Sequence, residues 1–282
     1  METDKQKNGH GRGKGRGNLD TLESDVERAM LRTPEQTPGP TAEQNRQAVI
    51  RVKIPHIQKQ VLTLVVKNEA GSPLVTHRFP HGALYAMLKG KNETEDRKKD
   101  KVLPERIPDT EFRLALYVYD REERRLICGP DEIDRFKDLD LTVKGYSNFR
   151  KRYAFVLPAR MFKDALVGAT KYTEGITAAY VKQVVHVFGN LGDWCEIESP
   201  RPPVMREDIV QIGPWNNKSP QLRFRPQFDS WSTTLKIRFL SNFMTDEQIG
   251  ALVQYAGATM GVAEMRPEKS GLGGGMFIVE TK

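Results

Sequence analysis

The most regular pattern of apolar and polar positions lies in the last third of the chain. In the segment TLKIRFL, apolar residues alternate with polar ones, and this period of two predicts a strand with one buried face. Its inward residues are Leu235, Ile237 and Phe239. Its outward residues are Lys236 and Arg238, so we expect positive charge on the solvent side of this strand.

A helix is predicted directly after this strand. Thr245 and Gln248 have the spacing of a capping box, in which two side chains satisfy backbone groups at a helix start. The apolar stripe that follows has the helical period: Ile249, Leu252, Val253 and Ala256. Gly257 or Gly261 ends the helix, and the segments VAEMR and MFIVE predict two strands around the loop PEKSGLGGG.

This β-α-β-loop-β order predicts that residues 232–282 form a C-terminal ferredoxin-like unit. Its helix would cover one face of an antiparallel sheet and leave the other face open, as in the folds that stack RNA bases on a sheet. The expected fold class is α+β. We place the whole folded domain at residues 46–282, after an N-terminal arm of residues 1–45 that is too poor in large apolar residues to fold.

Strands and helices are also predicted earlier in the domain. The segments AVIRVKI and VLTLVV predict adjacent strands from Ala48, LVTHRF a short extended segment, and ALYAMLKG one or two helical turns. Residues 89–106 carry charges of both signs without apolar period, which predicts a mobile surface loop. Residues 112–120, FRLALYVYD, alternate like a half-buried strand that continues in RLIC.

The middle of the domain predicts a strand that leads into a helix. After YAFVLP, the helix stripe is Phe162, Ala165, Leu166 and Ala169, with Lys163 and Asp164 on the solvent side. A second helix is predicted over 177–182, and VVHVFG and WCEIES predict a strand pair joined by the turn at 189–192. Residues 199–231 are rich in Pro and Arg and predict an irregular, partly extended connection.

Composition favours a polyanionic partner. The formal net charge is +7 and the isoelectric point is about 9.3, which favours association with nucleic acid but says nothing of fold. No signal peptide or membrane span is predicted, so we expect a cytoplasmic protein with no membrane partner. Cys128 and Cys195 have no zinc-ligand spacing, and we expect reduced thiols, no metal and no cofactor.

Three segments are candidates for nucleic-acid binding, each with an alternative. In the arm, GRGKGRG would place Arg12, Lys14 and Arg16 on phosphates, or it is a solubilising tail. The glycine loop would let backbone N–H groups approach a phosphate, or it is a flexible hairpin loop; its residues are Gly271, Gly273 and Gly274, with Arg266 and Lys269 beside them.

The third segment is LRFRPQFDSW. Its arginines and aromatic residues fit a strip that stacks bases and pairs with phosphates, and Lys236 and Arg238 would extend it. The members of this strip are Arg223, Phe224, Arg225, Phe228 and Trp231. The alternative is that Phe224 and Trp231 belong to the core and that the arginines are solvated.

The segment VLPARMFKDALVGAT and the terminal GVAEMRPEKSGLGGGMFIV together resemble the RAMP superfamily, whose members are backbone and guide-processing subunits of CRISPR effector complexes. The matched positions are Pro158, Phe162, Lys163, Ala165 and Leu166. The resemblance implies tandem ferredoxin-like (RRM-like) units that bind RNA or single-stranded DNA along a groove, often as a homo-oligomer, and it makes Lys163 a candidate contact. The chain departs from the superfamily at Gly274, Gly275 and Met276, where an aromatic residue or an arginine is common.

A wider pattern resembles a family of tailed-phage proteins of this length with no established activity. It includes LVTHRF, MREDIVQIG, LRFRPQF and MRPEKSG, and it covers nearly all of residues 48–282. This resemblance implies the cytoplasm of a bacterial host.

We therefore predict non-catalytic binding of single-stranded RNA or DNA. One alternative is a phage structural or host-modulating factor with a protein partner. The other is a metal-independent ribonuclease that uses His77 as general base, since imidazole titrates near neutral pH. No second acid or base at a motif spacing accompanies His77, so a histidine without catalytic role is the favoured interpretation. His56 and His186 are expected in strands, as packing or hydrogen-bonded residues.

Overall fold

The computed structural model describes residues 56–78, 107–127, 133–212 and 217–280, all within one compact unit that begins at His56. In these residues the strands form antiparallel sheets covered by helices, so the α+β class is confirmed. The predictions for residues 1–55 and 79–106, including the arm, the first strand, the helical turns and the charged loop, lie outside the described residues.

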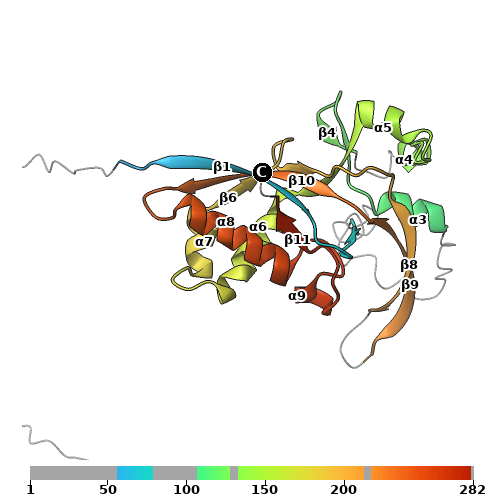
Figure 1. The fold of residues 1–282 in the computed structure, drawn as a ribbon. Coiled ribbons are helices and arrows are strands. Elements are labelled where there is room, and N and C mark those ends of the chain that lie inside the picture. Colours follow the sequence, from blue (N-terminus) through green and yellow to red (C-terminus); the bar gives the residue numbers. More distant parts are fainter. Residues whose placement is uncertain (1–55, 79–106, 128–132, 213–216, 281–282) are drawn as a thin grey trace, which may run out of the picture. The chain divides into compact units, whose positions relative to one another are not determined.

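The main sheet has four strands in the order β11-β1-β10-β6, and every neighbouring pair is antiparallel. Its strands are β1 (Lys59–Asn68), β6 (His186–Phe188), β10 (Ser232–Leu240) and β11 (Phe277–Val279). Helices α6 (Ala159–Ala169), α7 (Ala178–Val184) and α8 (Asp246–Tyr255) lie together on one side of these strands (Figure 1). The chain therefore passes through α6 and α7 between β1 and β6, and through α8 between β10 and β11.

The main core lies between this sheet and its helices. The inward residues of β10, Leu235, Ile237 and Phe239, are buried as predicted. The stripes of α6 and α8 are buried as well, and the Phe162 ring lies 5.8 Å from the Phe277 ring, which connects α6 to β11. The predicted capping box is present, since the Thr245 hydroxyl accepts from the Gln248 N–H. Local pattern and tertiary burial agree in this part of the chain.

Residues 232–280 do not form a sheet alone, because β10 lies between β1 and β6. The other two sheets have the orders β2-β9-β8 and β4-β3-β5-β7, and neither repeats the order of the main sheet. Their strands are β2 (Leu74–Val75), β3 (Val118–Asp120), β4 (Arg125–Leu126), β5 (Tyr153–Pro158), β7 (Trp194–Glu196), β8 (Val204–Ile212) and β9 (Ser219–Phe228). A second ferredoxin-like order is thus not found among the described residues.

The strand predicted over residues 112–120 is wrong for its first half, which is helix α3 (Pro108–Leu114). Pro108 occupies the first helical turn, and Asp109 and Glu111 lie at the positive end of the helix, where acidic residues are favoured. Phe112 and Leu116 are both buried and lie four residues apart. That spacing puts two residues on the same face of a helix and also on the same face of a strand, so the pattern does not distinguish the two. The second half of the segment is strand β3, which β4 continues as predicted.

The irregular connection predicted over residues 199–231 is wrong. Strands β8 and β9 pair over nine residues from Val204↔Gln227 to Ile212↔Ser219. Arg225 and Pro226 are both buried next to Phe224, so this end of β9 is covered on both faces and does not alternate. A strand of that kind has no period of two for sequence analysis to detect.

Two smaller corrections concern strand pairing. Strands β6 and β7 exist, but β6 pairs with β10 and β7 pairs with β5, so they join two sheets instead of forming a hairpin. The strand predicted for VAEMR is wrong, since Ala263 and Met265 have φ near +60°. The next residues form the short helix α9 (Pro267–Ser270), and the π-helical turn Ala256–Met260 follows α8.

The glycine loop is held by the main chain around it. Gly275 accepts from the Val262 N–H and donates to the Pro73 carbonyl, and Gly274 donates to the Met265 carbonyl. A Cβ on Gly275 would lie 1.9 Å from the Val262 oxygen, and its φ is +66°. The loop is therefore a packed part of the fold.

We expect Gly275→Ala to lower the free energy of unfolding by about 2–4 kcal/mol, from backbone strain and the forced shift of Val262 together. Gly271→Ala is the matched control, because Gly271 has a similar φ of +69° but no atom within 4 Å of a built Cβ. It should cost only ~1 kcal/mol. Urea unfolding measures both, and equal losses would contradict the close packing of Gly275.

Candidate nucleic-acid interface

The main sheet has a second side, opposite its helices, which we call the open face. The strand register places the alternate residues of β1, β6 and β10 on it. These residues are Lys59, Val61, Thr63, Val65, Lys67, His186, Phe188, Ser232, Thr234, Lys236, Arg238 and Leu240. Val61 is 58% exposed, and Thr63, His186 and Lys236 are exposed as well. The open face is therefore accessible to a ligand.

The open face carries four permanent cations. They are Lys59, Lys67, Lys236 and Arg238. Lys67 makes a half-exposed ion pair of 3.5 Å with Glu280, whereas no ion pair of Lys59 or Lys236 occurs among the described residues. Exposed pairs contribute little energy, so the Lys67 charge also stays available. The face is a positively charged surface with little acidic compensation.

One aromatic ring, Phe188, lies among the basic side chains of the open face. In the register, Thr63 lies beside Lys236 and Lys236 beside Phe188. One step along, Arg238 lies beside His186, and its guanidinium is 5.1 Å from the centre of the Phe188 ring. Phe188 is half-buried. Such a combination of cations and a ring suits both phosphates and base faces.

The pKa of His186 is lowered by its surroundings on the open face. Burial lowers its pKa, and the charges of Arg238, Lys163 and Lys59 lower it further. The imidazole is thus mostly neutral at neutral pH. A phosphate beside it would oppose these cations and favour protonation.

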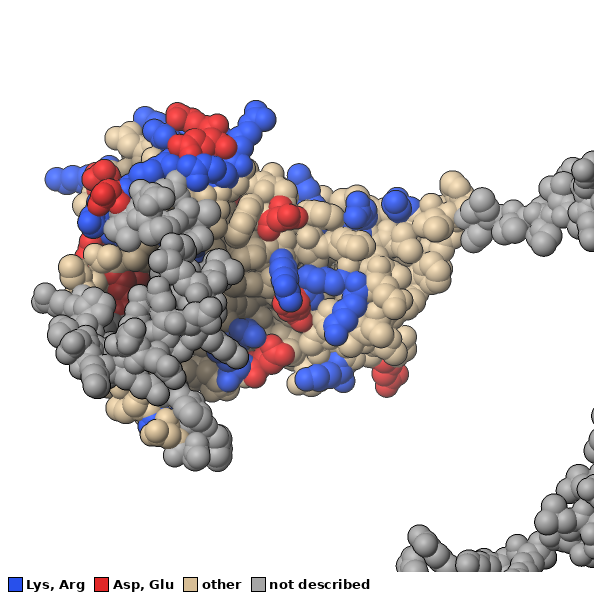
Figure 2. All heavy atoms as spheres, turned by 180° about the vertical axis from the view of Figure 1, so that it is seen from behind, with Lys and Arg blue, Asp and Glu red and all other residues tan. Residues whose placement is uncertain are grey.

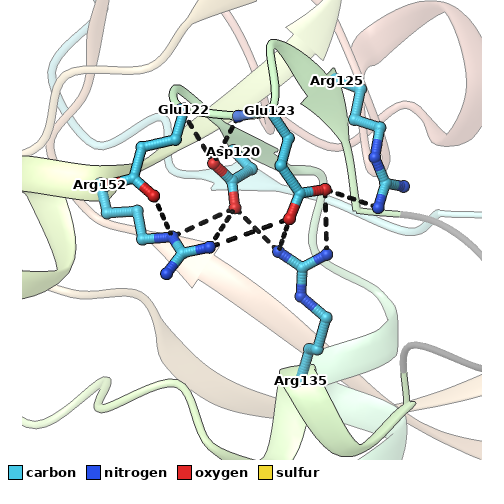
Figure 3. Close-up of polar contacts among 6 residues, drawn as sticks. All are labelled: Asp120, Glu122, Glu123, Arg125, Arg135 and Arg152. Atoms are coloured by element: carbon cyan, nitrogen blue, oxygen red, sulfur yellow. Dashed lines mark hydrogen bonds and ion pairs between the residues drawn. The ribbon is translucent and has the colours of Figure 1, made fainter.

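Around β4 and α5, positive and negative side chains pair with each other. Figure 2 shows blue and red side chains intermixed at the upper left, where β4, α4 (Ile133–Lys137) and α5 (Tyr146–Arg152) lie. The centre of this group is Asp120, whose side chain is fully buried and accepts from Arg135 at 2.8 Å and Arg152 at 3.1 Å (Figure 3). The backbone N–H groups of Glu122 and Glu123 also donate to it. These arginines serve the fold.

Lys163, a predicted contact, lies half-buried on α6 instead of on its solvent side. Its ammonium donates to the carbonyls of Val181 and Val185, at the end of α7. Cations are favoured at helix C-termini, where carbonyls lack partners. Burial lowers the Lys163 pKa to about 8, against the opposing charge of Asp164. The Lys163 ammonium therefore serves as a partner for the C-terminal carbonyls of α7.

The predicted aromatic and arginine strip is mostly interior. Trp231, Phe228 and Phe224 are buried, which is the core alternative. Arg225 is 8% exposed and lies 3.7 Å from Asp208, and Arg223 lies 3.7 Å from Glu111. Buried rings cannot stack with bases, and the arginines face carboxylates. We therefore do not place the ligand here.

The glycine loop holds its cations by internal bonds. Arg266 donates to the Ala263 carbonyl and pairs with Glu268, and Lys269 bonds both carboxylate oxygens of Glu264 at 2.7 Å. Gly271 and Gly273 are exposed, whereas Gly274 packs against Met265. The loop is thus packed at its Gly274–Gly275 end only, and the charges of Arg266 and Lys269 are compensated.

His77 lies at a narrow cavity of about 100 Å³ with Tyr117 and Glu264 in its lining. Its Nδ1 has no hydrogen-bond partner among the described residues, and burial, followed by the charge of Arg225, lowers its pKa. A neutral imidazole of this kind can act as a base, but the cavity is below the usual size of a ligand site. The arrangement offers no room for a nucleotide.

Sequence analysis found part of the open face and missed part of it. Lys236 and Arg238 were predicted and lie on it, while Arg12, Lys14 and Arg16 lie outside the described residues. Phe188, His186 and Lys59 were missed, because only the sheet register brings them to β10. Both histidines expected to pack in strands, His56 and His186, are exposed, and His56 lies just before β1.

Comparisons with known proteins do not show a family for this chain. No protein-family profile and no curated protein match the chain. One solved structure with detected similarity is Cmr6 from Pyrococcus furiosus, at 14% identity and a TM-score of 0.29, over 80% of this chain and 100% of that one. That TM-score is too low to support an argument. The resemblances to the RAMP superfamily and to phage proteins stay predictions.

Two further observations concern general properties. In the part of the chain that the structure describes, no helix has the length and apolar character to cross a membrane. Cys195 is buried, and burial raises its thiol pKa to about 12, so it is protonated and unreactive.

Proposed function

We propose that this protein binds single-stranded nucleic acid, without catalysis, on the open face of the main sheet. The single observation that carries the proposal is the register of β1, β10 and β6, which gathers Lys59, Lys236, Arg238 and Phe188 on one accessible surface. We further propose that the main sheet with α6 and α8 is one ferredoxin-like unit, since its strand order and helix positions suit the split β-α-β motif.

A single strand fits this face better than a duplex. Its bases are free to stack on an aromatic ring, whereas in a duplex they are already stacked and paired. The cations then neutralise phosphates along the strand, a contact that does not depend on sequence. The arm residues Arg12, Lys14 and Arg16 would add to this non-specific term.

The test is fluorescence anisotropy of labelled single-stranded RNA, single-stranded DNA and duplex DNA at two salt concentrations. We expect tighter binding of a single strand than of the duplex, and a loss of affinity as salt rises because counterions are released. Affinity without salt dependence, or no binding at low salt, would contradict the proposal. The same titration distinguishes RNA from DNA.

Binding should also depend on pH through His186. Phosphates raise the imidazole pKa in the complex above its lowered value in the free protein, so affinity should rise as pH falls from 7.5 to 5.5. We expect a gain of about threefold for oligouridylate, because one imidazole takes up a proton on binding. His186→Gln should bind with little pH dependence, and an unchanged gain in that variant would exclude His186.

A protein partner is the second candidate function. Strand β8 carries two exposed apolar side chains, Ile209 (75% exposed) and Met205 (46% exposed). Leu222 on β9 lies opposite Ile209 and is 42% exposed. Apolar side chains grouped on a surface favour a protein contact. Association measured by light scattering, lost in Ile209→Lys, would support this candidate.

A further inference from the structure

A groove opens at the outer edge of the main sheet, beside β6. Its volume is about 450 Å³, within the usual range of small-ligand sites. Strand β6 forms one wall, and the other walls come from the start of α6 and from Trp194 on β7. The groove thus lies between two sheets, at the point where the chain turns from β6 to β7.

The groove and the open face share residues. His186 and Phe188 belong to the open face by register and also line the groove. A strand that lies across β1 and β10 therefore reaches the groove without leaving the protein surface. Because the groove continues the cationic open face, we expect its occupant to be part of a strand that is bound on that face.

The lining suits a flat aromatic group with a phosphate at its edge. Phe188 and Trp194 both line the groove and are both half-buried, and the Trp194 ring also lies 6.3 Å from the Tyr117 ring. Arg160, which pairs with Asp164 at 3.5 Å through an exposed side chain, and His186 supply donors, while Asp193 adds one carboxylate to the lining. In addition, alternate residues of an antiparallel edge strand such as β6 direct their N–H and C=O groups away from the partner strand.

We propose that this groove binds one nucleobase of the strand held on the open face, between Phe188 and Trp194. The inference rests on the proposed function. It adds a base-dependent part to a binding that is otherwise driven by phosphates. A duplex cannot deliver an unpaired base, so the groove also gives a reason for selecting single strands.

The test compares oligothymidylate with an abasic strand of equal length and charge, by fluorescence anisotropy of the full chain. We expect the wild type to prefer the base-bearing strand by about 10-fold, from stacking of one base. Phe188→Leu and Trp194→Leu should each abolish most of this preference, because the affinity for the base-bearing strand falls more than the affinity for the abasic strand. Tyr172→Leu is the matched control, an exposed aromatic residue away from the groove.

The outcomes separate the two proposals. No salt-dependent binding of either strand would overturn the proposed function. Binding without preference for bases, or a preference lost in Phe188→Leu but kept in Trp194→Leu, would overturn the groove and leave the open face. If Trp194→Leu does not fold, tryptophan emission of a Trp215→Phe variant replaces it. Trp231 is buried, so a ligand that quenches this emission contacts Trp194. The groove predicts quenching by oligothymidylate and none by the abasic strand. Equal quenching by both strands would overturn the groove.

Discussion

The double substitution Lys236→Glu with Arg238→Glu is expected to weaken binding of a single-stranded oligonucleotide about 100-fold at moderate salt. Both side chains lie on the open face, in register with Phe188 and His186. Their loss removes two phosphate contacts, and the new carboxylates repel the strand. The slope of log affinity against log salt should fall by about two. Anisotropy titrations at several salt concentrations measure both effects.

The control is Lys171→Glu with Lys182→Glu. This pair changes the net charge by the same amount, but both residues are exposed near α7, on the helix-covered side of the main sheet. We expect a loss of less than about threefold from the change in net charge alone. Similar losses in the two double variants would show that only net charge matters and that the open face is not the site.

Asp120→Asn is expected to lower the free energy of unfolding by about 2–3 kcal/mol. The side chain is fully buried and accepts from Arg135, Arg152 and two backbone N–H groups (Figure 3). A neutral amide removes the carboxylate that both arginines share, although they keep their ion pairs with Glu122 and Glu123, and its NH₂ group faces donors. Urea unfolding followed by circular dichroism measures the loss.

Asp134→Asn is the control for this prediction. Asp134 pairs with Lys137 at 3.0 Å, but both side chains are exposed, so we expect a change below about 1 kcal/mol. A loss for Asp120→Asn no larger than that of Asp134→Asn would contradict the structural role of the buried carboxylate.

The same carboxylate should make stability depend on acid pH. Burial opposes its ionisation, but bonds from the Glu123 N–H and from Arg152 outweigh burial and lower the pKa of Asp120 below its ordinary value. Its contribution to stability is therefore complete above the unfolded pKa of about 3.9 and is lost as pH falls through the lower folded pKa. In Asp120→Asn this part of the acid dependence should be missing.

The sequence predicted the elements whose local pattern agrees with their burial. In α6, α8 and β10, apolar residues follow one period and pack against one surface, so Phe162, Leu252 and Ile237 were placed correctly. The end of β9 failed because Arg225 and Pro226 are buried beside Phe224. There the tertiary pairing with β8 decides the structure.

The proposed site is visible in the sequence only where a single strand is enough to define it. Alternation places Lys236 and Arg238 outward without any knowledge of neighbours. Phe188 and Lys59 join them through pairings that span 48 and 181 residues of sequence, Lys236↔Phe188 and Lys59↔Leu240, and no local pattern contains that register. The carboxylates that face the arginines of LRFRPQF, Asp208 and Glu111, lie on other elements, so the local pattern does not show them either.

The most direct test of the open face is photo-crosslinking of the full chain to a single-stranded oligonucleotide that carries a photoreactive base, followed by mass spectrometry of the linked peptides. We predict crosslinks in the peptides that contain Phe188 and residues 232–240, with few in α7 or α8. Crosslinks confined to the helices on the other side of the main sheet, or to the β8–β9 hairpin, would contradict the account.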